Sequence, residues 1–218
     1  MDIFVVRVSD IMGEFGRKEI YDRLPDFRRR AADECRNQAD RDRSLTAGAL
    51  LLFCMKKGGV SLEETPEFNE NGKMFFPRES GFYVNLSHSG DYAACVVDTK
   101  EVGIDIERIR QYKENVARRI CLPKEMQYLE GKKEEEKNRV FTKLWTRKES
   151  MAKLSGKGIA LLLEAYENSG NVSEGGGDCI YTKTYTSISG YFLSVSSHED
   201  HFPDQIILLS PESLGQWR

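Results

Sequence analysis

The sequence predicts an α+β fold made of two similar halves within one chain. Segments with helical or strand periodicity come in runs instead of alternating, which favours α+β over a doubly wound parallel sheet. The order strand, helices, strands is followed by helices and strands again, and each half contains one long helix ending in glycine, at 44–58 and 145–156. We therefore expect halves of residues 1–102 and 103–218, with a functional site in the cleft between them.

The first half starts with an apolar run over 3–8, which predicts a strand. Helical periodicity then extends from 14 to about 58, where two consecutive glycines end it. Asn71-Gly72 predicts a turn. Three short strands, joined by polar turns, are expected at 82–85, 92–97 and 102–106.

The second half has a helical stretch from 123 to about 155, and Gly156 and Gly158 end it. The highly charged block 131–137 within this stretch is expected to be a solvated face or a loop. A glycine-rich loop at 175–177 precedes the remaining strands, which are expected at 180–186, 191–195 and 205–209.

Composition excludes several classes of protein. Of the 218 residues, 39% are hydrophobic and 31% charged, which is typical of a globular domain, and the net charge of −3 argues against non-specific nucleic-acid binding. The longest apolar run, over 47–55, is far shorter than the roughly 18 residues that a membrane-spanning helix needs. The five cysteines are widely spaced without a CxxC pair, and the first residues do not resemble a signal peptide. We therefore expect a cytoplasmic protein with reduced thiols.

The first candidate site is the segment 103–107, with sequence GIDIE. Asp105 and Glu107 are two residues apart on a predicted strand, so their carboxylates leave the same face about 7 Å apart. Two such carboxylates can bind Mg²⁺ together with phosphate oxygens. The alternative is a solvated strand face on which Glu107 pairs with Arg108 or Arg110.

The second candidate is a helical stripe of Trp145, Glu149 and Lys153, spaced four residues apart. The alternative is an exposed Glu-to-Lys ion pair that contributes a few tenths of a kcal/mol, on the order of 0.3. The large ring of Trp145 favours an interior position, which would bring Glu149 and Lys153 into a cleft. A metal ion and a phosphate group would satisfy both charges there.

The third candidate is the polar turn 85–91, which contains His88 between hydroxyl groups and a glycine. Backbone amides in such a turn can approach an anion. Cations that could join it lie upstream, at Arg28, Arg29, Arg30, Arg41 and Arg43. The Gly72-Lys73 pair is a weak signal by itself.

Together and in this order, these segments resemble the motifs of the 4′-phosphopantetheinyl transferases, in the long, surfactin-synthetase-activating (Sfp-type) branch. The resemblance covers roughly residues 41–158. It is carried by the Gly-Lys turn, NLSHSG at 85–90, GIDIE at 103–107 and WTRKESMAKLSGKG at 145–158. Where the family usually has proline after the Gly-Lys, this chain has Met74.

The resemblance implies transfer of the 4′-phosphopantetheine arm of coenzyme A to a serine of a carrier protein, with release of adenosine 3′,5′-bisphosphate. It also implies a fold of two similar halves with coenzyme A in the cleft. Asp105, Glu107 and Glu149 would hold Mg²⁺, with Glu125 nearby. Lys153 would meet the pyrophosphate and assist the leaving group. Glu149, directly or through a metal-bound water, would be the base that takes the serine proton.

For coenzyme A itself, the resemblance implies that His88 and Arg43 bind the 3′-phosphate, with Ser87 beside them. The Gly72-Lys73 loop would border the adenine. The chain would act as a monomer, since both halves are present.

The expected partner is an apo carrier protein with an acidic surface around its serine, and the resemblance leaves acyl, peptidyl and aryl carriers open. Its docking surface is expected at 112–130. An alternative from another class is a non-catalytic binding module in which the same charged residues form structural ion pairs. Metal-dependent binding of coenzyme A would distinguish the transferase from that module.

Overall fold

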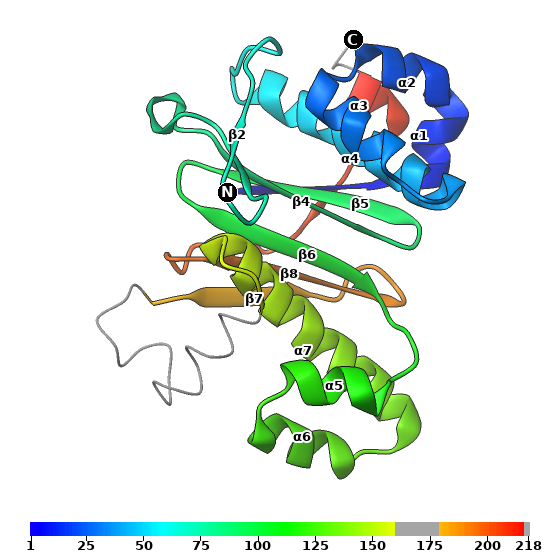
Figure 1. Ribbon diagram of the computed structural model, residues 1–218, viewed down its shortest axis with the longest axis vertical. Coiled ribbons are helices and arrows are strands. Elements are labelled where there is room, and N and C mark those ends of the chain that lie inside the picture. Colours follow the sequence, from blue (N-terminus) through cyan, green and yellow to red (C-terminus); the bar gives the residue numbers. More distant parts are fainter. Residues whose placement is uncertain (160–178, 216–218) are drawn as a thin grey trace.

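The computed structural model describes residues 1–159 and 179–215, and its elements form a mixed α+β structure, which confirms the predicted class (Figure 1). The predicted glycine-rich loop at 175–177 lies outside the described residues. Within the described part of the chain, no helix is long and apolar enough to cross a membrane.

The first sheet contains four strands in the order β4-β5-β1-β9. Their bounds are Tyr83–Ser89 for β4, Tyr92–Asp98 for β5, Asp2–Arg7 for β1 and Ile207–Leu208 for β9. β1 pairs with β5 in antiparallel and with β9 in parallel orientation. Its residues Ile3, Phe4, Val5 and Val6 are all buried, because both faces of the sheet are covered.

The second sheet contains three antiparallel strands in the order β6-β8-β7. These are β6 (Val102–Arg108), β8 (Tyr191–Ser197) and β7 (Tyr181–Tyr185). Ile104 and Ile106 of β6 pack with Ile3 and Val5 of β1 in one apolar cluster, so the two sheets bury a face against each other. The isoleucines of GIDIE therefore point into the core, as predicted.

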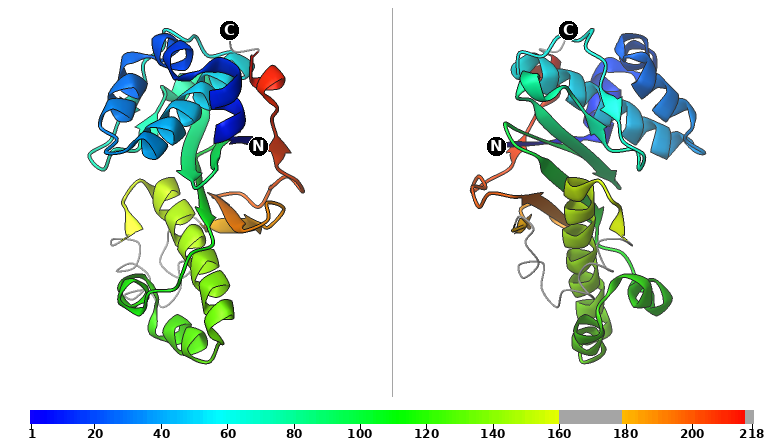
Figure 2. Two further views of the ribbon diagram at one scale, coloured as in Figure 1. Left: turned by 90° about the vertical axis from the view of Figure 1, so that its right-hand side faces the viewer. Right: turned by 60° about the vertical axis from the view of Figure 1, so that its left-hand side comes forward.

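Helices cover the outer faces of both sheets, as Figure 1 and the two views in Figure 2 show. The first sheet is covered by α4, with three shorter helices packed around it. The second is covered by α7, which packs on β6 and β8. The helix bounds are Val8–Phe15 for α1, Arg17–Arg23 for α2, Asp26–Asp33 for α3, Gln38–Lys57 for α4, Glu114–Ile120 for α5, Pro123–Glu130 for α6, Glu134–Ser155 for α7 and Pro211–Leu214 for α9.

The predicted single helical stretch over 14–58 is wrong in detail, because four helices span this region and the first begins at Val8. Gly16 separates α1 from α2 with φ +73°, and Pro25 precedes α3. Asn37 starts α4, and its side chain accepts a hydrogen bond from the backbone N–H of Asp40. The helical stretch over 123–155 is likewise divided, with a break after Gly131. Helix α5 was not predicted.

A short hairpin of β2 (Glu67–Phe68) and β3 (Met74–Phe75) connects α4 to β4, followed by a 3₁₀ turn at Arg78–Ser80. The predicted Asn71-Gly72 turn forms its tip, where Gly72 has φ +78°.

Candidate active site

The edge strands β4 and β6 of the two sheets lie side by side and are joined by side chains. Three polar side chains of β4 accept hydrogen bonds from backbone N–H groups of β6: Asn85 from Ile104 (3.0 Å), Ser87 from Ile106 (3.2 Å) and Ser89 from Arg108 (3.2 Å). The NLSHSG motif therefore supplies hydrogen-bond acceptors to the backbone N–H groups along one edge of the GIDIE strand. These bonds hold the two sheets together at the β4–β6 contact, which we call the seam.

The same serines orient the two carboxylates of GIDIE. Ser87 Oγ donates to Asp105 Oδ1 at 2.9 Å, and Ser89 Oγ donates to Glu107 Oε2 at 2.7 Å. Asp105 and Glu107 thus lie on one face of β6, as their spacing predicts. Glu107 also pairs with Arg110, as the alternative interpretation of this segment expects.

Asp105 is buried, with 5% of its surface exposed, and it carries an unused ligand atom. Its Oδ1 accepts from Lys153 Nζ at 2.8 Å, whereas its buried Oδ2 has no hydrogen-bond partner among the residues that the structure describes. Burial raises the pKa of Asp105 to about 6, although Lys153 and Ser87 favour the charged form. A cation bound at Oδ2 would remove this cost, so this carboxylate is suited to bind a metal ion.

Glu149 of α7 faces the same space. Burial raises the pKa of Glu149, and the charge of Glu107 adds to the increase. Lys153 turns to Asp105 instead of forming the isolated surface pair with Glu149 that the alternative interpretation of this stripe expects. Over residues 1–159 and 179–215, however, no three Asp, Glu, His or Cys side chains are grouped closely enough to hold a metal ion. The three predicted metal ligands share one cavity without forming a finished cage.

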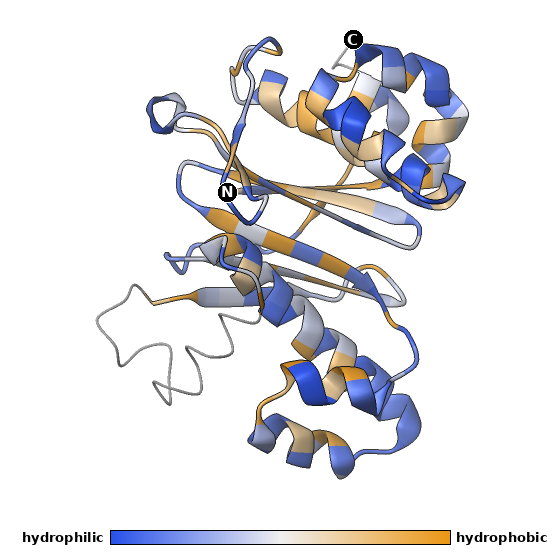
Figure 3. Cartoon of the chain, viewed as in Figure 1, coloured by the Kyte–Doolittle hydropathy of each residue, from blue (hydrophilic) through white to orange (hydrophobic). Residues whose placement is uncertain are grey.

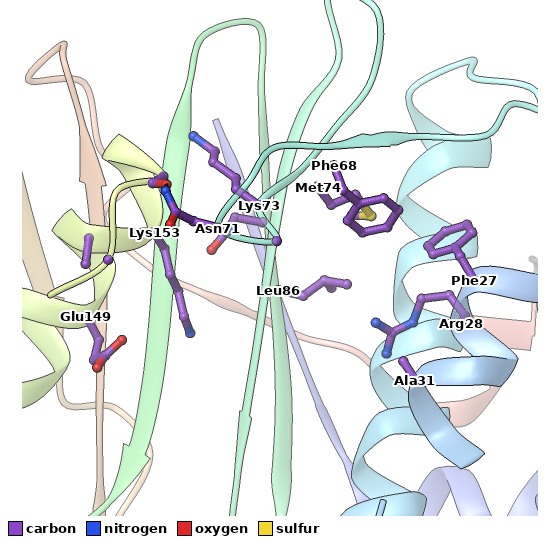
Figure 4. A pocket seen from close by; sticks show the side chains of 15 residues that line it. Phe27, Arg28, Ala31, Phe68, Asn71, Lys73, Met74, Leu86, Glu149 and Lys153 are labelled. Atoms are coloured by element: carbon purple, nitrogen blue, oxygen red, sulfur yellow. The ribbon is translucent and has the colours of Figure 1, made fainter. Parts of the chain in front are cut away.

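Two adjoining cavities, which we together call the groove, contain most of the predicted site residues. The larger measures about 500 Å³ and the smaller about 340 Å³, and Arg28, Leu86, Glu149 and Lys153 line both. The larger cavity is also lined by Ser87, His88, Asp105, Glu107 and Trp145. The smaller is also lined by Phe27, Phe68, Asn71, Gly72, Lys73 and Met74. Figure 4 shows Arg28 on one side of the smaller cavity and Glu149 and Lys153 on the other.

Arg28 is a cation of the groove that sequence analysis did not single out. Its Nη2 donates to Ser44 O at 2.8 Å, and its buried Nε has no partner in the described part of the chain. Burial lowers the pKa of Arg28 to about 10. No carboxylate pairs with it among the described residues. Its neighbours differ, since Arg29 pairs with Asp26 and Arg30 is exposed. Helical periodicity is the signal that could have distinguished Arg28 from them.

His88 faces the larger cavity, and its pKa is lowered by partial burial and by three neighbouring cations. Burial, together with Arg28, Arg43 and Lys153, lowers the pKa of His88 to about 4. Arg43 lines neither cavity; it pairs with Asp40 and donates to Gly90 O at 3.3 Å. His88 and Arg43 are therefore close enough to interact electrostatically, and of these two residues His88 lines the groove whereas Arg43 does not.

Three further predicted residues make contacts that sequence analysis did not foresee. Ser87 Oγ also receives a hydrogen bond from Lys153 at 3.1 Å, so this hydroxyl is fully engaged within the protein. Lys73 donates its Nζ to Leu154 O, and burial lowers the pKa of Lys73. Glu125, expected near the metal, instead pairs with Lys148 at 2.6 Å and lines neither cavity of the groove.

Comparison with known proteins gives consistent matches. The model of the 4′-phosphopantetheinyl transferase superfamily matches residues 101–194. A 4′-phosphopantetheinyl transferase of Bacillus subtilis is 33% identical over 180 residues, covering 79% of each chain. The 4′-phosphopantetheinyl transferase Sfp of Bacillus subtilis strain 168 is 33% identical over 153 residues, which cover 66% of this chain and 68% of Sfp. The 4′-phosphopantetheinyl transferase psf-1 of Bacillus pumilus is 29% identical over 229 residues, covering 98% of this chain and 97% of psf-1.

Proposed function

The chain belongs to the 4′-phosphopantetheinyl transferase superfamily, and from this premise we propose a complete reaction for it. It transfers the 4′-phosphopantetheine arm of coenzyme A to a serine of an apo carrier protein, requires Mg²⁺, and releases adenosine 3′,5′-bisphosphate. The groove is the active-site cleft between two halves, residues 1–102 and 103–218.

One observation carries the proposal: the groove places an unsatisfied carboxylate oxygen and an unpaired cation in the same cavity. Among the described residues, Asp105 Oδ2 has no hydrogen-bond partner and suits a metal ion, and Arg28 has no carboxylate partner and suits a phosphate. Buried charges whose polar atoms are not all satisfied are costly, so they are typical of a site that binds a charged ligand. Mg²⁺ would pair with the carboxylate of Asp105, and a phosphate of coenzyme A would pair with Arg28.

The lining of the groove supports one orientation of coenzyme A. Phe27, Phe68 and Met74 make the smaller cavity largely apolar, which suits the adenine ring. Arg28 and His88, with the charge of Arg43 behind them, suit the 3′-phosphate. Binding a phosphate would raise the depressed pKa of His88, because the charged imidazolium then gains an anionic partner.

The reacting groups that we propose all line the larger cavity. Asp105, Glu107 and Glu149 would hold Mg²⁺, which neutralises pyrophosphate charge when bound. Glu149 accepts the proton of the carrier serine, a role for which its raised pKa is suited. The serine oxygen forms a bond to the phosphorus that carries pantetheine, and the bond to the bridging oxygen breaks. Lys153, held at Asp105, can turn to that bridging oxygen and stabilise the negative charge of the leaving bisphosphate.

A third cavity, of about 170 Å³, supports the approach of the carrier from the side of Glu107. Arg110 and Lys113 contribute basic groups to it, and Phe141 and Trp145 contribute aromatic surface. A basic rim around an apolar centre complements a carrier that is acidic around its serine. The docking surface is thus proposed at 110–116 and α7, overlapping the predicted range 112–130.

The test is to incubate the protein with coenzyme A and a panel of apo acyl, peptidyl and aryl carriers, with Mg²⁺ or with a chelator. Intact mass is expected to rise by one phosphopantetheine arm for at least one carrier, only with Mg²⁺. Coenzyme A that binds, as measured by calorimetry, without transfer to any carrier would favour the non-catalytic module instead.

A further inference from the structure

The tip of the β2–β3 hairpin is attached to the C-terminal end of α7 by three side chains. Asn69 Nδ2 and Asn71 Nδ2 donate to Gly156 O at 3.1 and 2.9 Å, and Lys73 Nζ donates to Leu154 O. Carbonyls at a helix C-terminus have no partner within the helix, and they favour donors and positive charge. We call residues 69–73 the anchored turn.

The helix is the rigid side of this attachment. A Cβ atom added at Gly103 of β6 would lie 2.1 Å from Ser150 O and 2.4 Å from Leu154 N, so α7 and β6 are in direct backbone contact. A Cβ at Gly156 would lie 2.7 Å from Asn69 Nδ2, so the turn also approaches closely. The end of α7 therefore has little freedom to move toward or away from the turn.

The hairpin is the weaker side. Its strands are two residues each, and Phe68 and Phe75 are 52% and 38% exposed. Two-stranded hairpins of this size are not stable by themselves in water. The hairpin also contacts α3 through the Phe68 and Phe27 rings, but the position of the anchored turn depends on its hydrogen bonds to α7. The turn lines the smaller cavity on the side away from Phe27 (Figure 4).

The two asparagines differ in what they do. Asn69 Oδ1 accepts from the backbone N–H groups of Asn71 (3.0 Å) and Lys73 (2.8 Å), so Asn69 shapes the turn as well as attaching it. The side chain of Asn71, which is exposed, makes the contact to Gly156 only within the described structure. A substitution of Asn71 therefore removes the hydrogen bond to α7 without removing the hydrogen bonds that shape the turn.

We propose that Asn69 and Asn71 are positioning residues that hold the nucleotide-facing wall of the groove against α7. They set the affinity for the adenosine bisphosphate part of coenzyme A and take no part in the chemistry. This inference rests on the proposed function, since it assigns the smaller cavity to the nucleotide.

The experiment compares wild type, Asn71→Ala, Asn71→Asp and the adjacent exposed control Glu70→Ala. Calorimetry with adenosine 3′,5′-bisphosphate and with coenzyme A, at one Mg²⁺ concentration, reports binding; transfer to a carrier reports kcat and KM. Asn71→Ala should weaken both ligands by the same factor, about three- to tenfold for one lost hydrogen bond. Asn71→Asp, the same size but facing Gly156 O with an acceptor, should weaken them at least as much. The kcat at saturating coenzyme A and the thermal midpoint should match Glu70→Ala.

Unchanged affinity in both Asn71 variants would overturn the inference, as would a loss of kcat together with thermal stability, which indicates a structural role only. A wild-type protein that binds coenzyme A and modifies a carrier separates these outcomes from failure of the proposed function. A wild-type protein that binds neither ligand would overturn both.

Discussion

The two long helices α4 and α7 each cover one sheet, but they are held by different chemistry. The buried side chains of α4 are largely aliphatic, and Leu45, Leu50 and Met55 are fully buried on different sides of the helix. In α7 the buried positions include hydroxyls that pair with β8: Thr146 with Ser194 at 3.0 Å and Ser150 with Ser196 at 2.8 Å. Figure 3 shows the same contrast, with α7 largely hydrophilic along its length.

The difference in packing chemistry corresponds to the side chains that each helix carries into the site. Aliphatic surfaces tolerate small shifts, whereas paired hydroxyls in a buried interface are satisfied in only one register. α7 carries Glu149 and Lys153, whose positions relative to Asp105 decide the site, and α4 contributes Arg43 near its start. α4 thus contributes stability, whereas α7 fixes the positions of the charged side chains.

The largest expected effect is a loss of activity when a charged residue of α7 is replaced. Glu149→Gln should lower kcat by roughly 10²–10⁴-fold, the usual contribution of a positioned general base. Stability should hold or rise, because burial disfavours the charged form of Glu149. Steady-state transfer kinetics and thermal unfolding check both. Recovery of most of the rate on raising Mg²⁺ would make Glu149 mainly a metal ligand, and an unchanged rate at ordinary Mg²⁺ would contradict both roles.

The reciprocal change is in α4. Leu50→Ala should lower the free energy of unfolding by about 2–5 kcal/mol, because Leu50 is fully buried and its removal leaves a cavity. The kcat per folded molecule should stay at the wild-type value. Urea unfolding and active-site titration measure the two quantities, with the exposed Leu62→Ala as a control that costs about 0.5 kcal/mol or less. A matching loss of kcat would break the division of roles between the helices.

The seam should respond to pH. With its pKa raised to about 6, folded Asp105 binds a proton more tightly than the unfolded chain, whose aspartate titrates near 3.9. Wild-type stability should therefore fall through this group as pH rises from about 4 to about 6, by roughly 2–3 kcal/mol, and stay lower above that window. Asp105→Asn lacks this loss. Its advantage over wild type in urea unfolding should grow across the window, and parallel curves would rule the assignment out.

The smallest expected effect tests the hydroxyl pairs directly. Ser150→Ala should cost about 1 kcal/mol, since Ser196 keeps a second partner in Thr182 at 2.8 Å. A double-mutant cycle with Ser196→Ala should give a coupling energy of a few tenths to about 1 kcal/mol. Additive losses would show that the pair does not fix the register of α7.

Local spacing predicted much of the candidate site. Asp105 and Glu107 face one way because a strand alternates, and Lys153 follows Glu149 by one helical turn. The strands at 92–97 and 191–195 also correspond to β5 and β8. These features depend on neighbours in the chain, so periodicity is enough to predict them.

Other features depend on contacts between distant segments. Lys73 and Leu154 are brought together only by the fold: Gly156 indicates that a helix ends near Leu154, but nothing near Lys73 indicates that its side chain caps that helix. Arg28 is distinguished from Arg29 by which face of α3 is covered, and Glu125 is directed away from the groove by buried Lys148. The divisions of the helical stretch 14–58 did have local signals, at Gly16, Pro25 and Asn37, which the apolar periodicity outweighed.

The parallel pairing of β9 with β1 has a consequence for biosynthesis. Phe4 lies opposite Ile207, and the backbone N–H of Leu209 donates to Val5 O at 2.9 Å, so two segments far apart in the sequence are neighbours in one sheet. Until translation passes residue 209, the nascent chain has an open apolar strand edge that is prone to pair with other chains. Closing so long a loop is also slow. Residues 1–102 expressed alone should therefore aggregate, and the pairing of β9 with β1 should be the last contact of this sheet to form.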